Sequence, residues 1–141
     1  MSELRSPLIP RHVVAEQNLL RLLLLNDETC LMMLATLDNL MLSDPRHQSI
    51  LADLRDQAAS TKSGPVGMEE TGILGTFIRN LNHKYREQPD LQHTLADLIL
   101  TADQLSEQLG LEALSPAQQR EQLARFATGQ RHIVDTHRQS E

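Results

Sequence analysis

The segment PRHVVAEQNLLRLLLLNDE, residues 10–28, decides the fold class because six of the seven positions 19–25 are leucine. Burying one leucine side chain contributes about 1.5–3 kcal/mol, so such a run is expected to leave water. Arg21 interrupts the run and Asn26-Asp27 ends it, which makes it too short to span a membrane. The segment therefore predicts a buried helix over residues 13–25 of a soluble domain.

The rest of the chain also favours helices. Aromatic residues make up 2% of the 141 residues and tryptophan is absent, so the core must consist of leucine, isoleucine, methionine, valine and alanine. Apolar residues recur at helical spacing in five further segments, at residues 28–42, 45–59, 68–85, 91–109 and 116–137. We expect an all-α, compact multi-helix bundle of about six helices.

The chain is organised as one domain with short ends. Residues 1–12 contain two prolines and are expected to form an extended arm, and residues 138–141 are expected to form a frayed tail. The helical domain covers residues 13–137, with a compact front at 13–86 and a carboxy-terminal helical pair at 88–137. Glycine, proline and hydroxyl residues in 60–67 predict a mobile loop between two helices.

Helix ends carry recognisable signals. The candidate N-caps are Asp27, Asp44 and Ser115, and the last two are followed by the first-turn prolines Pro45 and Pro116. Gly110 is a carboxyl-end glycine that can end a helix. Gln118 stands three residues after Ser115, as in a capping box. Gly72 and Gly75 weaken the first turns of the helix over 68–85, so that helix is expected to fray or to start later.

Charge and cysteine content narrow the function classes. The net charge of −6 and the pI of about 5.5 provide no overall attraction for phosphate, so direct nucleic-acid binding is disfavoured. A local basic patch keeps that binding open as an alternative, and its members are Arg120, Arg125, Arg131 and Arg138. Cys30 is the single cysteine, so no intrachain disulfide can form, which is typical of a cytoplasmic protein.

No set of residues predicts catalysis. His12 with Glu16, and His93 with Asp97, are four residues apart, but two ligands are too few for a structural zinc site. Cys30 lies at the front of an apolar helix, which predicts a buried, inert thiol. The glycines of residues 60–75 lack the lysine and hydroxyl residue of a phosphate loop. We expect no enzyme activity, no metal and no cofactor.

The opening segment resembles the amino-terminal domain of bacterial replicative DNA helicases. That family begins with a proline–histidine arm, followed by Ala-Glu-Gln and a leucine-rich helix that ends at an Asn/Asp break. The matching positions are Pro10, His12, Ala15, Glu16, Gln17, Leu20, Leu23, Leu24, Asn26 and Glu28. The segment DPRHQSILADL, residues 44–54, is similar to the family's basic-His-x-x-Ile pattern, which opens another helix.

The carboxy-terminal helicase-binding domain of bacterial primases shares that fold, and ALSPAQQREQLARF, residues 113–126, is similar to the start of its last helix. The chain departs from the helicase pattern by one residue fewer between His12 and Ala15. It also contains neither the ATPase domain nor the primase catalytic domain. The resemblance implies a free-standing module that docks helicase to primase or competes with that docking.

Three hypotheses about function follow. The first is a non-catalytic protein–protein interaction module that binds a replicative helicase or primase, through Leu98, Leu105, Leu109, Leu123 and Phe126 of the helical pair. The second is a self-associating regulatory or structural protein, encoded by a mobile element, that forms a homodimer through the heptad-like leucines of residues 91–109. The third is a DNA-binding regulator that uses the arginines of the last helix.

Overall fold

The computed structural model describes the backbone of residues 10–37, 40–61 and 68–140, and the side chains in these ranges except at 60–61, 68–71 and 138–140. It is all-α, as predicted, and no strand occurs in these ranges. The six α-helices are α1 (Arg11–Leu23), α2 (Asp27–Thr36), α3 (Pro45–Thr61), α4 (Met68–Lys84), α5 (Pro89–Gln108) and α6 (Pro116–Ser140). Two short 3-10 turns, η2 (Tyr85–Glu87) and η3 (Leu111–Ala113), flank α5.

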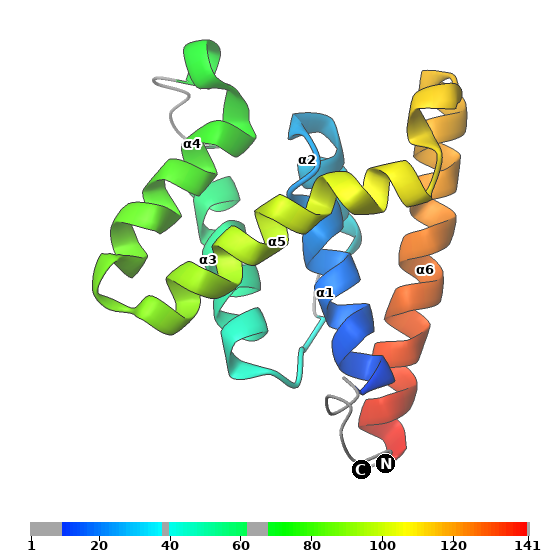
Figure 1. Cartoon of the computed structure of the whole chain (residues 1–141), viewed down its shortest axis with the longest axis horizontal. Helices are drawn as coiled ribbons and strands as arrows, with labels where there is room; N and C mark the ends of the chain where they lie inside the picture. Colours follow the sequence, from blue (N-terminus) through cyan, green and yellow to red (C-terminus); the bar gives the residue numbers. More distant parts are fainter. Residues whose placement is uncertain (1–9, 38–39, 62–67, 141) are drawn as a thin grey trace, which may run out of the picture.

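Helix α1 forms the centre of the bundle. It packs mainly against α6, which runs antiparallel beside it, and against α5, which crosses it (Figure 1). Four leucines of the run, Leu19, Leu20, Leu22 and Leu23, are buried with 0–1% of their surface exposed. The leucine run therefore forms the core of this chain, as its composition predicts.

Helices α5 and α6 occupy the range of the predicted carboxy-terminal helical pair. They meet at a corner formed by Gly110 and η3 and then diverge, so that α5 lies across α1 and α3 while α6 follows α1 (Figure 1). Gly110 adopts the left-handed conformation, with φ +66°, that ends a helix and lets the chain turn. Both helices pack on α1, so the front at 13–86 and the helices of 88–137 share one core.

Helix α2 ends at Thr36, six residues before the predicted end at residue 42. Leu37, Leu40 and Leu42 are nevertheless buried, so the apolar pattern reflects core packing by a non-helical segment. The carboxyl end of α2 is held by arginines from other helices. Arg55 of α3 donates to the carbonyl of Leu37, and Arg131 of α6 donates to the carbonyl of Thr36 at 2.8 Å.

The start of α2 differs from the prediction by one residue. Asn26, not Asp27, is the N-cap, because its side chain accepts the Thr29 N–H at 2.8 Å. Asp27 instead accepts the N–H of Leu74 at 2.9 Å and so caps the part of α4 that follows a break at Gly72. Gly72 has φ +79°, so the helix starts at Met68 but is interrupted at Gly72, where fraying or a later start was expected.

Other predicted signals are confirmed. Asp44 caps α3 by accepting the N–H of Arg46 at 2.9 Å. Ser115 and Gln118 form the reciprocal contacts of a capping box, at 3.0 and 3.2 Å.

The ends of the chain are more helical than predicted. Helix α1 begins at Arg11, two residues early, and α6 continues through 138–140, where a frayed tail was expected. Residues 1–9 of the predicted arm, residue 141 and residues 62–67 of the predicted loop lie outside the described residues. Among the described helices, none has the length and apolar character needed to cross a bilayer.

Candidate functional site

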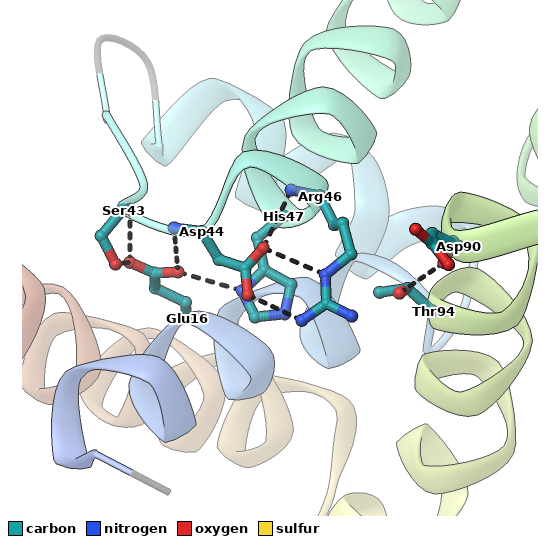
Figure 2. Close-up of polar contacts among 7 residues, drawn as sticks. All are labelled: Glu16, Ser43, Asp44, Arg46, His47, Asp90 and Thr94. Atoms are coloured by element: carbon teal, nitrogen blue, oxygen red, sulfur yellow. Dashed lines mark hydrogen bonds and ion pairs between the residues drawn. The ribbon is translucent and has the colours of Figure 1, made fainter. Parts of the chain in front are cut away.

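A polar cluster is buried between α1 and the start of α3. Glu16 has no exposed surface and His47 is 2% exposed, although both stand among leucines. The Oε1 atom of Glu16 lies 3.0 Å from Nδ1 of His47 (Figure 2). The backbone N–H and the hydroxyl of Ser43 donate to Oε2 of Glu16 at 2.6 and 2.7 Å, and the N–H of Asp44 donates to Oε1 at 3.3 Å. We call Glu16, Ser43, Asp44 and His47 the Glu16 clasp.

Helical periodicity explains how the two central side chains come to face the core. Glu16 stands three and four residues before Leu19 and Leu20, and His47 stands three and four residues before Ile50 and Leu51. Side chains at these spacings share one helix face, so each polar group follows the leucines and isoleucine into the interior. A buried polar group needs hydrogen-bond partners, and Glu16 and His47 are partners for each other.

The electrostatics of the clasp favour a charged Glu16. Burial raises the pKa of this carboxyl, but the hydrogen bonds from His47, Ser43 and Asp44 outweigh burial and hold the pKa below its ordinary value of 4.5. A carboxylate that accepts four hydrogen bonds from its own chain has little remaining capacity for a ligand. The clasp therefore fixes the connection before α3 onto α1.

Asp44 and Arg46 extend the clasp toward the surface. Arg46 donates from Nε and from a terminal nitrogen to the two carboxylate oxygens of Asp44, at 3.2 and 3.0 Å. These contacts hold the pKa of Asp44 below its ordinary value. Beyond Arg46 lies the start of α5, with Asp90 in its first turn and Thr94 in its second (Figure 2). A shallow cavity of about 300 Å³ separates the two helix starts.

The clasp connects residues 10–28 with residues 44–54. Glu16 belongs to the sequence pattern of the first segment and His47 to that of the second, but their contact was not predicted. A signal was present, because each is a polar residue that stands three and four positions before two apolar residues of its helix.

The predicted partner-binding residues are divided between core and surface. Leu98, Leu105 and Leu123 are buried against their own chain, so they do not form a contact surface in this structure. The prediction is corrected for these three residues. Leu98 and Leu105 belong to α5, which packs on α1 and α3, and Leu123 belongs to α6, which packs on α1. Leu109 and Phe126 are partly buried and reach the surface.

The predicted arginine patch is largely neutralised. Arg120 pairs with Glu28 at 3.7 Å and Arg125 with Glu121 at 3.2 Å. Arg131 lies 3.7 Å from Asp135 and also holds the carboxyl end of α2, as described above. Arg138 belongs to the last turns of α6, but its side chain lies outside the described residues. Paired arginines attract phosphate less strongly than free ones do, so the patch gives little support to DNA binding.

The members of the His12–Glu16 pair each contact another residue. Glu16 faces His47, while His12 stacks on His137 of α6 with ring centroids 3.4 Å apart. These two rings line an open cavity of about 360 Å³ together with Arg11 and His132. His93 and Asp97 are exposed on α5. In the described part of the chain, no three His, Cys, Asp or Glu side chains are grouped as metal ligands would be.

Cys30 lies in the core without exposed surface, as predicted. Burial, together with the nearby charge of Asp27, raises the pKa of its thiol to about 12. A thiol with this pKa is almost entirely protonated at neutral pH and is a poor nucleophile.

No family model, no curated protein and no solved structure matches the chain. The residues themselves therefore carry the functional argument.

Proposed function

We propose that the chain is a non-catalytic, cytoplasmic protein–protein interaction module that docks to, or regulates, a replicative helicase or primase. The Glu16 clasp is the observation that carries the proposal. It brings together residues 10–28 and 44–54, the two segments on which the resemblance to helicase amino-terminal domains rests. A buried contact between two segments that each resemble the same family supports the proposal more than either segment does alone.

The position of the leucine run also supports the proposal. The residues that match the helicase pattern at Leu20, Leu23 and Leu24 are buried in the core. They therefore pack in the chain's own core, and the docking contact must involve other residues. Phe126 and Leu109 are the remaining candidates from the predicted partner-binding set, and both reach the surface.

The alternatives receive less support. In the heptad-like series, Leu95, Leu98, Ala102 and Leu105 are buried in the chain's own core, so they do not offer a seam for a second copy. The described arginines of α6 are paired with carboxylates. The interaction module therefore remains the function with the most direct support.

Binding of the purified full chain to the replicative helicase and the primase of the same organism tests the proposal. Biolayer interferometry with the immobilised chain is expected to detect at least one of the two. Phe126→Ala is expected to weaken binding at least about fivefold, because aromatic side chains often dominate interfaces. Glu121→Gln is the matched control on the outer face of α6 and is expected to change binding less than about twofold.

Thermal melting of Phe126→Ala accompanies the binding measurement, because this side chain also packs partly against the core. A variant that remains folded yet binds as well as wild type would remove Phe126 from the contact. If neither the helicase nor the primase binds the wild-type chain, the proposed function is wrong.

A further inference from the structure

The negative charge of the chain is concentrated around α5. Residues 87–119 contain six carboxylates and no lysine or arginine, so their formal charge of −6 equals that of the whole chain. All six are exposed, and they are Glu87, Asp90, Asp97, Asp103, Glu107 and Glu112. A stretch of this kind creates a local negative field even though the rest of the chain is close to neutral.

An exposed leucine stands at the centre of the outer face of α5. The inner face is formed by Leu95, Leu98, Ala102 and Leu105, and a rotation of about 100° per residue places Leu100 opposite them. Leu100 is 71% exposed, more than any other large apolar side chain in the described ranges. Most of the described leucines are buried or partly buried, and Leu31, at 41%, is the other exposed one.

Acidic side chains surround Leu100 on the same face. Asp103 and Glu107 follow it by three and seven residues, so they lie on the same helix face about one and two turns away. Among the described residues, neither carboxylate has a Lys, Arg or His nitrogen within 4 Å. Asp97, three residues before Leu100, interacts with Arg21 only at longer range. The outer face of α5 is not covered by any described helix (Figure 1).

We propose that this outer face of α5 is a docking surface for a cationic amphipathic helix of a partner protein. An apolar stripe on that helix covers Leu100, while its lysines or arginines pair with Asp103 and Glu107. The distance along the helix axis from Asp103 to Glu107 is about 6 Å, or roughly one turn, which matches basic residues three or four positions apart on the partner helix. The charge of the face selects this occupant, because nucleic acid and anionic membrane surfaces are repelled.

The inference goes beyond the proposed function and does not depend on it. It specifies the chemistry of a partner segment for α5, whereas the helicase or primase contact was assigned to Phe126 and Leu109. A synthetic probe therefore tests α5 without either replication protein, and the two proposals can fail separately.

The probe is a fluorescein-labelled helical peptide of about five turns, with leucines along one face and lysines beside them. Fluorescence anisotropy with the full chain is expected to show binding that weakens with added salt, because salt screens exposed charges. Leu100→Ser and the double variant Asp103→Asn/Glu107→Gln are each expected to weaken binding at least about tenfold. The double variant should also show a weaker dependence on salt.

The matched control is Glu28→Gln/Glu121→Gln, which removes the same charge from exposed positions on α2 and α6. It is expected to change the affinity less than about threefold. If the control weakens binding as much as the α5 variant, the peptide senses only net charge and the proposal is wrong. No binding by the wild-type chain would likewise refute it.

Methyl NMR locates the contact independently of affinity. In a leucine-labelled chain, the Leu100 methyl signals are expected to shift on addition of the peptide, while those of buried Leu95 and Leu98 change little. Shifts centred on another element would overturn the proposal. So would a dimer of the free chain that dissociates on Leu100→Ser, because the face would then be occupied by a second copy.

Discussion

The substitution Glu16→Gln is the sharpest test of the Glu16 clasp. It keeps the size of the side chain but removes the charge and one acceptor oxygen. Three hydrogen bonds, from Ser43 at 2.6 and 2.7 Å and from His47 at 3.0 Å, change from charge-assisted to neutral or are lost. Charge-assisted bonds exceed neutral ones by about 1 kcal/mol each, so we expect a loss of about 3 kcal/mol in the free energy of unfolding.

Urea denaturation followed by circular dichroism measures this loss. For a domain of this size, about 3 kcal/mol corresponds to a decrease of roughly 6–12 °C in Tm. Glu28→Gln is the matched control, because Glu28 forms an exposed ion pair with Arg120 at 3.7 Å. It is expected to cost less than about 1 kcal/mol. If both variants lose the same stability, the clasp does not have the energetic role assigned to it.

The pH dependence of stability provides a second test of the Glu16 clasp. The pKa of Glu16 is lower in the folded chain than its ordinary value of 4.5, despite burial, because of the bonds from His47, Ser43 and Asp44. Such a carboxyl stabilises the fold above its unfolded pKa, and the stabilisation is lost as pH falls through the folded pKa. The stability difference between wild type and Glu16→Gln should therefore shrink below about pH 4.5. A difference that stays constant from about pH 7 to pH 3 would refute the argument.

Two further predictions concern backbone strain and thiol chemistry. Gly72→Ala should destabilise the chain by at least about 1 kcal/mol, because φ is +79° and a Cβ would lie 2.6 Å from Oδ2 of Asp27. Gly129→Ala, in open space on α6, should instead stabilise it by about 0.5–1 kcal/mol, and equal effects in urea denaturation would contradict this contrast. Cys30 should react with a thiol reagent such as DTNB only when urea unfolds the chain, and rapid reaction of the native protein would show that the thiol is accessible.

Local sequence signals predicted most of the helices but not how they are arranged. The start of α3 at Asp44-Pro45 and the capping box of α6 depend on residues within one turn, and both are confirmed. The end of α2 was placed too late, because the leucines of residues 37–42 are buried without being helical. An apolar pattern records burial, and burial does not always require a helix.

The functional residues were harder to predict for the same reason. Leu105 was expected at a partner contact, but a stripe of leucines cannot reveal whether it faces its own chain or another. The contact between Glu16 and His47 joins residues 31 positions apart, and no local rule predicts it. Leu100 lies outside the three–four spacing of its helix, so it was not among the expected partner-binding residues. It is nevertheless far more exposed than Leu105.

The polar contacts of this bundle explain how a core dominated by leucine specifies one arrangement. Leucine packing is weakly directional, and cores of uniform leucine tend to lose a unique structure before they lose stability. Here helix ends are fixed by side chains from distant elements. Asp27 of α2 caps α4, Arg131 of α6 holds the end of α2, and Glu16 of α1 holds the segment that leads into α3. Each contact has one geometry, so a shifted helix would leave the donors and acceptors of these contacts without their partners.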